Sequence, residues 1–449
     1  MYDKLTLKIR SVGFEDAISQ TSVHTEDDKK IFQEKEYLIP LTLEEFKEKY
    51  DVDPECVWYA PIFSCGSYYF NKRTLAICSL HVEYEMIKAL DEIVPSSVLI
   101  AEKHAREGKF YLMIHDFPDR MRFQYLKMVL ESGRNDVDIY KLFLNVYFSS
   151  DFGFNEFGTE LIRYVIQQRS KESILETQDK IKNLPEKMCL YRGEGSKSTP
   201  HEKAFSWTTD INCAYKFACR YGEDSAKIIT AEAHRDDIIE YVTTVNENEI
   251  FIDPENVRVI SELQLKGINF LSQEIDELSD VFLEYKGLLQ SIRFTKDLTE
   301  HGKEHALRVL LLCLIMGDCY GLSLEDQSKL ELAAIFHDSK RVNDYEDRKH
   351  GEDGAIYFTE TTLISSTIVE FLCKYHSIPD EEGIRAIGDL PYSPERLEEI
   401  LLLYNIFKDA DALDRVRFGF NDLDVNMLRT PLARELPLVA RLIFEGLKM

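Results

Sequence analysis

The chain has 449 residues, of which 44% are hydrophobic and 11% aromatic, so it is long enough for two or three domains with buried cores. Its formal net charge of −26 argues against general binding to nucleic-acid backbones or anionic membranes, because both attract clustered positive charge. Nine cysteines without any Cys-x-x-Cys pair indicate reduced thiols rather than a disulfide framework. The first residues carry no apolar secretory signal, so we expect a cytoplasmic protein without a membrane segment.

Changes in residue pattern along the chain predict several domains. Residues 1–114 mix short β-rich runs with helical stretches and form an unassigned α+β region. Residues 115–262 begin with apolar residues at three- and four-residue spacings and continue with short β-rich segments, which together predict an α+β domain. We expect a helical connector over 263–284 and an all-α domain over 285–449.

The elements expected inside the α+β domain fall into two groups. Helices come first in the chain, and short strands with one interposed helix follow them. The expected helices span 121–131, 138–148, 160–182 and 212–220, and the expected strands span 188–191, 204–207, 227–233, 238–242 and 257–260.

Three short pieces of this domain place polar residues on or beside predicted strands. Arg192 belongs to Leu-Tyr-Arg-Gly, Ser206 and Thr208 belong to Ser-Trp-Thr-Thr, and Glu247 and Glu249 belong to Glu-Asn-Glu. Each piece alone is weak evidence, but their order and spacing resemble the arginine–serine–glutamate class of mono-ADP-ribosyltransferases. Many relatives carry Ser-Thr-Ser where this chain has Ser-Trp-Thr-Thr, a departure that we interpret as variation.

The resemblance implies that NAD is a substrate and assigns a role to each residue. Arg192 would contact the NAD phosphates, Ser206 and Thr208 would shape the nicotinamide pocket, and Glu249 would be catalytic. Arginine is a planar, permanently charged donor suited to phosphate, and a carboxylate stabilises positive charge that develops on ribose. Glu247, two residues before Glu249, is also counted as catalytic, and its position favours arginine as the residue that accepts ADP-ribose. We expect the macromolecule that carries this arginine to be a protein.

Histidine and aspartate gather in the C-terminal all-α region. Five of the chain's eleven histidines lie between residues 301 and 376. His305 precedes a long apolar run, the pair His337-Asp338 follows another, and Asp411 lies in Lys-Asp-Ala-Asp-Ala-Leu. Imidazole and carboxylate together suit ions such as Zn, Fe, Mn or Ni, which activate water for hydrolysis.

This ordered series of histidine and aspartate resembles the HD-domain metal phosphohydrolases. The resemblance implies one or two divalent ions (Mn, Fe, Ni, Zn or Mg) and a nucleotide or phosphodiester substrate. The implied metal ligands are His305, His337, Asp338, His350, His376 and Asp411, with Asp338 also counted as catalytic. The candidates to bind substrate phosphate are Arg308, Lys340 and Arg341.

Two nearby residues leave the ligand set open. Asp409 is a rival to Asp411, and because two helical residues at this spacing point about 200° apart, only one of them can face the metal. His301 lies four residues before His305 and is a candidate for a substrate contact or for the support of a ligand.

Together the two resemblances indicate a bifunctional enzyme, in which an HD phosphohydrolase processes the product of ADP-ribosyl transfer or a nucleotide. The pairing is a distant analogy to SidE-type effectors, although the order of domains is reversed. We therefore expect an effector or toxin acting in a bacterial cytoplasm or, if translocated, in a host cytosol. The alternative is a defence or signalling enzyme that hydrolyses nucleotides and cleaves NAD with water. In a third hypothesis, the protein is not an enzyme and both domains are retained only as binding modules. The complete sets of functional residues argue against it.

Overall fold

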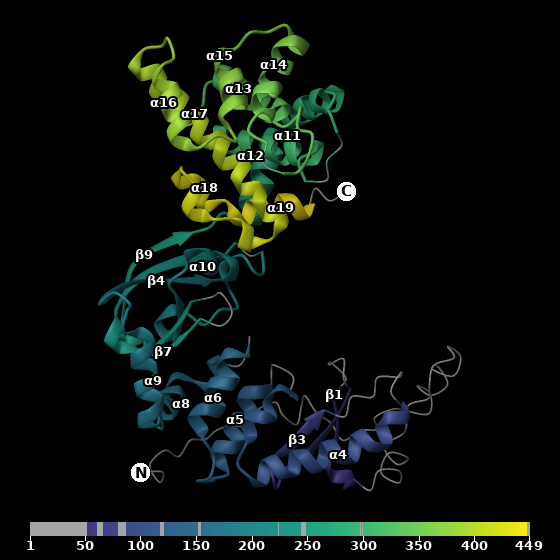
Figure 1. The fold of residues 1–449 in the computed structure, drawn as a ribbon, viewed down its shortest axis with the longest axis vertical. Coiled ribbons are helices and arrows are strands. Elements are labelled where there is room, and N and C mark those ends of the chain that lie inside the picture. The colour runs from purple at the N-terminus through teal and green to yellow at the C-terminus, as the bar shows by residue number, and fades with distance from the viewer. Residues whose placement is uncertain are drawn as a thin grey trace. The chain divides into compact units, whose positions relative to one another are not determined.

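The chain divides into two compact units, Met1–Leu175 and Glu176–Met449. Their ribbon is drawn in Figure 1 from a computed structural model. The boundary that the sequence suggests after residue 114 divides the chain differently and stays a prediction. The structure describes residues 52–60, 66–79, 87–116, 121–150, 154–222, 224–243, 248–296, 298, 300–345 and 347–446.

The first unit combines a small antiparallel sheet with helices. Its strands β1 (Val57–Ala60), β2 (Gly66–Asn71) and β3 (Ala76–Ser79) pair in chain order. Buried aromatic residues hold the unit together, and the hydroxyl of Tyr125 donates to the carbonyl of Leu75 at 2.7 Å. Its helices are α4 (Ile87–Arg106), α5 (Arg122–Glu131), α6 (Ile139–Phe148), α7 (Phe154–Phe157) and α8 (Thr159–Ile166), with short 3-10 turns at Pro54–Cys56, Phe110–Leu112 and Ile114–Asp116.

The single helix predicted over 160–182 is wrong, because the chain forms two helices there. These are α8 and α9 (Lys171–Ile181). Between them the hydroxyl of Ser170 accepts a hydrogen bond from the backbone nitrogen of Ser173 at 3.1 Å, an interaction typical of a helix start. Apolar residues keep their helical spacing on both sides of the break, so the hydrophobic pattern does not reveal it. The capping residue Ser170 is the signal that a new helix begins.

The second unit begins with a six-stranded antiparallel sheet in the order β7-β8-β5-β4-β6-β9. The expected strands lie on β4, β5, β6, β7 and β9, and β8 adds the segment that follows residue 248. The strands are β4 (Lys187–Glu194), β5 (Ser206–Thr208), β6 (Lys227–His234), β7 (Ile238–Val242), β8 (Glu249–Ile252) and β9 (Val257–Gln264). Short 3-10 turns occupy His201–Lys203, Arg235–Asp237 and Pro254–Asn256.

Helix α10 (Ile211–Ala218) packs closely against β4. Gly193 permits this approach, since a Cβ at that position would lie 1.9 Å from the carbonyl oxygen of Ala214. Another apolar core of the sheet contains Leu190, Trp207 and Ile250 and includes the end of α9. The sheet region is therefore an α+β arrangement, and Arg192 lies beside the glycine that brings α10 close.

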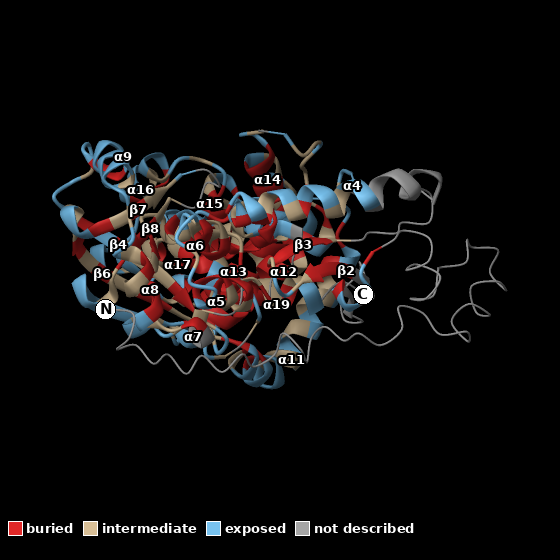
Figure 2. Cartoon of the chain, turned by 90° about the horizontal axis from the view of Figure 1, so that it is seen from below, coloured by how far each residue is buried: buried red, intermediate tan, exposed pale blue. Residues whose placement is uncertain are grey.

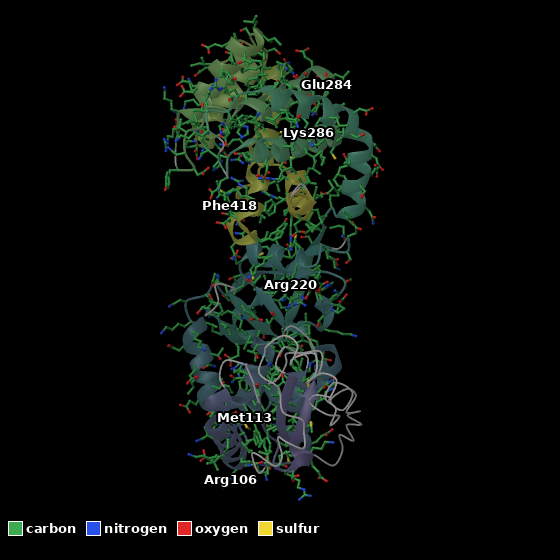
Figure 3. All side chains as sticks on the ribbon, turned by 90° about the vertical axis from the view of Figure 1, so that its right-hand side faces the viewer. Arg106, Met113, Arg220, Glu284, Lys286 and Phe418 are labelled. Carbon is green, nitrogen blue, oxygen red and sulfur yellow. The ribbon has the colours of Figure 1, made fainter. Side chains whose placement is uncertain are left out.

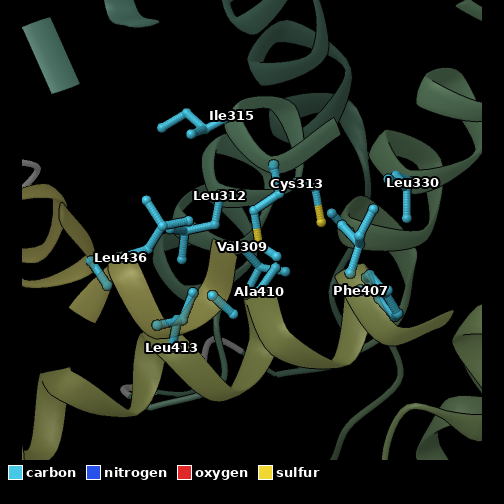
Figure 4. Close-up of a cluster of buried hydrophobic side chains, with 14 of the residues drawn as sticks. Val309, Leu312, Cys313, Ile315, Leu330, Phe407, Ala410, Leu413 and Leu436 are labelled. Carbon is cyan, nitrogen blue, oxygen red and sulfur yellow. The ribbon is translucent and has the colours of Figure 1, made fainter. Parts of the chain in front are cut away.

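The rest of the second unit is helical. Helix α12 (Lys303–Cys319) is buried along most of its length and packs against α13 (Leu324–Phe336) and α17 (Pro394–Leu413) (Figure 4). In Figure 2, α12 and α13 are largely coloured as buried. The helices are α11 (Ile268–Ser291), α12 (Lys303–Cys319), α13 (Leu324–Phe336), α14 (His350–Thr362), α15 (Thr367–Tyr375), α16 (Asp380–Gly388), α17 (Pro394–Leu413), α18 (Pro431–Glu435) and α19 (Pro437–Gly446). Between α17 and α18 lie 3-10 turns η10 (Asp414–Phe418), η11 (Phe420–Asp422) and η12 (Val425–Met427).

The sheet and the helices of this unit share one apolar core. Tyr215 and Cys219 belong to the same buried cluster as Val309 and Leu436. The hydroxyl of Tyr215 also donates to the carbonyl of Arg434 at 2.8 Å. Among the helices that the structure describes, none is long and apolar enough to cross a membrane.

Candidate metal centre

Helix α12 positions the first of the predicted ligands. His305 lies in its first turn and is 1% exposed, because other helices surround α12. Nε2 of His305 lies 3.2 Å from Oδ1 of Asp411, in the last turn of α17, and 3.2 Å from Nε2 of His337, which follows α13. These three residues form one group that could hold a metal ion.

A second pair of histidines is formed by His350 and His376. His350 is the first residue of α14, His376 follows α15, and their Nε2 atoms lie 2.9 Å apart. Oδ1 of Asp338 lies 3.0 Å from Nε2 of His350 and 3.5 Å from Nε2 of His376. Gly351 permits close packing of α14 here, since a Cβ would lie 2.4 Å from the carbonyl oxygen of Cys373. A larger residue would therefore push His350 away from its partner.

Asp338 lies between the two groups. Its Oδ2 is 3.6 Å from Nε2 of His305 and 3.7 Å from Nε2 of His337, while Oδ1 faces the second pair. The residue is 2% exposed, and within the described part of the chain Oδ1 accepts no hydrogen bond. A buried carboxylate oxygen without a donor is costly, so a bound cation would satisfy it.

The other ring nitrogen of each histidine indicates where the proton lies. Nδ1 of His337 donates to the carbonyl of Ala334 at 2.9 Å, and Nδ1 of His376 donates to the carbonyl of Cys373 at 2.7 Å. His350 forms the same kind of bond with a backbone carbonyl three residues earlier. A neutral ring protonated at Nδ1 presents only a lone pair at Nε2.

The facing lone pairs of these rings fit a shared cation. Between His350 and His376 they are 2.9 Å apart, and without a proton or cation between them they repel. Metal–nitrogen bonds of about 2.0–2.1 Å place two nitrogen ligands of one ion roughly 3 Å apart. The separations between donors therefore suit divalent ions on both sides of Asp338.

Burial and neighbouring charges shift the pKa values in the first group. Burial alone would lower the pKa of His305, but its hydrogen bonds with Asp411 and Asp414 outweigh burial and raise the pKa to about 9. Burial lowers the pKa of His337 to about 3. Burial also opposes ionisation of Asp411, yet the hydrogen bond with His305 holds its pKa well below the usual range. A cation at this group therefore competes with a proton on His305.

The centre opens into a cavity of about 610 Å³. Asp338, His376 and Asp411 line the cavity, and Arg341 and Arg415 add positive charge to its wall. The cavity also contains a further group that could hold a cation, formed by Glu300, His301 and Asp344.

Two aromatic side chains complete the cavity wall. Tyr345 is 81% exposed and Phe418, labelled in Figure 3, is 40% exposed. The guanidinium of Arg417 lies 4.1 Å from the centre of the Phe418 ring, which supports one side of that ring. Exposed aromatic rings beside a polar cavity offer a surface for a planar group of a ligand.

Comparison with known families decides the nature of this region. Residues 302–416 match the HD domain family. This region is an HD domain. The match includes all six predicted metal ligands, and an HD domain implies a divalent metal and suggests phosphohydrolase activity. No curated protein and no solved structure matches the chain, and the matched residues do not include the central sheet.

The three predicted phosphate-binding residues of the HD domain have different surroundings. Arg308 is 6% exposed and donates through Nε and Nη2 to the carboxylate of Asp414. Lys340 lies over the ring of Tyr357, with Nζ 3.2 Å from the ring centre. Of the three, Arg341 lines the cavity, where its Nη1 lies 3.6 Å from Oδ1 of Asp338. The phosphate role stays a prediction for each residue, and Arg341 has the best position for it.

The two rival aspartates of α17 have separate roles. Asp409 is completely buried and accepts hydrogen bonds from the backbone nitrogens of Arg429 and Thr430 at 2.9 and 2.8 Å. It thereby holds the chain just before α18. Asp411 instead lines the cavity beside His305, as the opposite directions of the two side chains require.

Two other residues contact the predicted ligands. Nδ1 of His301 lies 3.1 Å from Oδ2 of Asp338, so the residue could support that ligand or face the substrate. Asp414 is 1% exposed and lies 2.7 Å from Nδ1 of His305, a contact that sequence reasoning missed. The available signal was its spacing of three residues from Asp411, which returns to nearly the same side of a helix.

The predicted NAD-binding residues lie on three adjacent strands of the central sheet. Nη1 of Arg192 on β4 donates to the carbonyl of Ser206 on β5 at 2.7 Å. The hydroxyl of Ser206 donates to the carboxylate of Glu249 on β8. Thr208 pairs with Glu249 in the sheet and is 6% exposed. Glu247 lies outside the described residues.

Proposed function

We propose that the HD domain hydrolyses a phosphoric ester, with a nucleotide or phosphodiester as substrate. The observation that carries this proposal is the position of Asp338 between two pairs of histidines whose Nε2 atoms face each other. Four imidazoles favour Mn, Fe, Ni or Zn over Mg, which prefers oxygen ligands. When bound, two such ions supply an activated water and hold the phosphoryl oxygens.

Arg341 is the residue that we assign to substrate phosphate. Its Nε and Nη2 atoms donate to the carbonyls of Asn343 and Tyr345, both at 3.0 Å. These bonds fix the guanidinium and leave Nη1 on the side of Asp338. A phosphoryl oxygen near the centre would meet a preorganised donor, which is the favoured way to bind phosphate.

The dimensions and lining of the cavity favour a small substrate. A volume of about 610 Å³ falls within the range of roughly 300–1,000 Å³ that is typical for sites of small molecules. Tyr345 and Phe418 offer aromatic faces on which a base could stack, and Arg415 adds a second cation for a phosphate. These features support a nucleotide more than a phosphoric ester that lacks an aromatic base.

The test is hydrolysis of a panel of nucleoside mono-, di- and triphosphates and cyclic dinucleotides by purified protein. We expect turnover that chelation abolishes and Mn²⁺ restores, and that His337→Ala lowers by more than about 100-fold. His234→Ala is the matched control, since this side chain at the end of β6 is 37% exposed and pairs with Glu186. Metal-independent turnover, or equal activity in His337→Ala, would contradict the proposal.

A second candidate function is transfer of ADP-ribose from NAD to a macromolecule, with arginine of a protein as the favoured acceptor. The specific observation in its favour is the contact chain from Arg192 through Ser206 to Glu249. In this reaction nicotinamide leaves as the acceptor nitrogen attacks, and a nearby carboxylate stabilises the positive charge on ribose. Cleavage of NAD with water would use the same residues.

The two candidate activities are tested together with labelled NAD and lysate. Label on a protein band that is absent with Glu249→Gln would support transfer, and free ADP-ribose without a labelled band would support the glycohydrolase alternative. If the HD domain processes the product, His337→Ala should increase the label or change its mass. Intact NAD in every reaction would remove the second candidate and leave the hydrolase.

A further inference from the structure

Asp414 lies directly behind one metal ligand. Its Oδ2 accepts a hydrogen bond from Nδ1 of His305 at 2.7 Å, and its side chain is 1% exposed. Arg308 donates to both oxygens, and Nη1 of Arg417 lies 3.1 Å from Oδ2. Two guanidiniums therefore hold this buried carboxylate in place on the side of His305 away from the cavity.

His305 differs from the other three histidines in this respect. Nδ1 of His337, His350 and His376 each donates to a neutral backbone carbonyl. Only His305 among these four donates to a carboxylate. An ionised acceptor fixes the proton at Nδ1 and increases the electron density at Nε2, so the ring becomes a stronger metal ligand.

We propose that Asp414 is a positioning residue that orients His305 and sets the affinity for the ion held with His337 and Asp411. The inference rests on the proposed metal centre and goes beyond it. It states that the histidine pair with His305 is held by the buried carboxylate of Asp414, whereas the pair of His350 and His376 is not. An ion held beside His305 would depend on the buried charge of Asp414, the first residue of η10, whereas an ion beside His350 and His376 would not.

A purely structural role for Asp414 makes a different prediction. If the carboxylate only neutralises Arg308 and Arg417, removal of either arginine partner should disturb the centre as much as removal of the carboxylate. If it orients His305, loss of Arg417 should leave metal binding nearly unchanged, because the 2.7 Å contact with His305 stays in place. Arg417→Gln is therefore the matched control.

The experiment is calorimetric titration of metal-free full-length protein with Mn²⁺, in the wild type, Asp414→Asn, Asp414→Glu and Arg417→Gln. We expect Asp414→Asn and Asp414→Glu to weaken one binding event by about 10–100-fold and to retain the other. Asp414→Glu keeps the negative charge but moves the oxygen away from Nδ1. The retained event in each variant serves as the internal measure of folding, alongside the circular dichroism spectrum.

The possible results separate the inference from the proposed function. Wild-type protein that binds no Mn²⁺ would overturn the metal centre and the inference with it. Mn²⁺ binding in the wild type that Asp414→Asn leaves unchanged would overturn the inference alone. Equal weakening of every event in Asp414→Asn and Arg417→Gln would assign a structural role to Asp414 and also overturn it.

Discussion

At the scale of single residues, the centre depends on what each carboxylate oxygen faces. The two oxygens of Asp338 face different histidine pairs, and Oδ1 has no hydrogen-bond donor among the described residues. Asp409, by contrast, has its oxygens occupied by backbone and side-chain donors. Two buried aspartates of the same domain thus serve different purposes, one ready for a cation and one already satisfied.

We expect Asp338→Asn to remove most metal binding, because it takes away the negative charge that both groups share. Affinity for Mn²⁺ should fall by more than about 100-fold, since even indirect partners of a ligand contribute 10–100-fold. Melting of the metal-free protein should change little, because Oδ1 accepts no hydrogen bond and the amide oxygen of Asn can replace Oδ2 as the partner of His301. Titration with Mn²⁺ checks this, and near wild-type affinity in Asp338→Asn would contradict the assignment.

Metal binding should also release a proton. The raised pKa of His305, about 9, means that the metal-free protein carries a proton on this ring at neutral pH, and a cation at Nε2 must displace it. The affinity for the metal should therefore fall as the pH is lowered, since a lower pH favours the proton on His305. Calorimetry at pH 7.5 in buffers of different ionisation enthalpy should report about one proton released per chain. Binding without proton release would show that His305 is neutral beforehand.

Sequence patterns alone predict a set of metal ligands, but they do not show why these residues meet in the fold. The ordered histidines and aspartates, with their apolar flanks, suffice to select six residues that the fold brings together. The choice between Asp409 and Asp411 needs the position of Thr430, which lies far along the chain. The three-residue spacing of Asp414 from Asp411 does not by itself predict a role, because that role arises from a contact with residue 305.

At the scale of elements, the centre is built from helix ends. His337 and His376 follow α13 and α15, His350 begins α14, and Asp411 lies in the last turn of α17. Helix ends project side chains away from the apolar core into a shared space, whereas residues in the middle of a buried helix meet other helices. The apolar pattern predicts these helices, but the tight packing at Gly351 that brings α14 close requires the folded structure.

An ion pair near the start of α13 should make stability depend on pH. The hydrogen bond with Arg396 lowers the pKa of Asp326 to about 2, and both side chains are mostly buried. Because the folded pKa is below the unfolded value, the stabilisation is complete above about pH 4 and is lost as pH falls through 2. We expect Asp326→Asn to cost about 1–2 kcal/mol at pH 7 and about half of that at pH 3.

Urea unfolding of both proteins at pH 7 and pH 3 measures this difference. Lys374→Ala is a suitable control, since its pair with Glu352 is about half exposed and should contribute little. An Asp326→Asn penalty that stays constant between the two pH values would show that the pKa of Asp326 is not lowered in the folded protein.

Helix α10 of the sheet region supports one wall of the HD cavity. Nδ2 of Asn212 donates to the carboxylate of Asp424 at 3.1 Å. Oδ1 of Asn212 accepts a hydrogen bond from the backbone nitrogen of Val425 at 2.8 Å. These bonds anchor the segment that follows the cavity-lining residues Phe418 and Asp422. We expect Asn212→Ala to raise KM by several-fold with little change in Mn²⁺ affinity, since each lost bond costs about 1 kcal/mol.

Hydrogen exchange gives a direct measurement of that anchor. The amide of Val425 should exchange faster in Asn212→Ala, whereas amides of α12 should keep wild-type rates. Wild-type exchange at Val425 together with wild-type KM would exclude α10 as the support of this wall.

At the scale of the whole molecule, the matched HD region is not a self-contained body. The buried cluster around α12 also includes residues of α10 and α19, which lie on either side of residues 302–416 in the sequence. The sequence predicts separate sheet and helical regions from their different periodicities, and both are present. It does not predict their shared core, because a contact between Tyr215 and residues near 434 leaves no local pattern.

A shared core implies that the sheet and the HD helices unfold together. The chain has two tryptophans, at positions 58 and 207, so Trp58→Phe leaves Trp207 as the fluorescent reporter of the sheet core. Leu413, labelled in Figure 4, is completely buried among the HD helices, and Leu413→Ala should cost about 2–5 kcal/mol. We expect Leu413→Ala, made in the Trp58→Phe protein, to lower two urea midpoints by the same amount. One midpoint is measured by Trp207 fluorescence and the other by the helical signal in circular dichroism. Independent domains would behave differently: the Trp207 midpoint would stay at its original value while only the helical signal shifted.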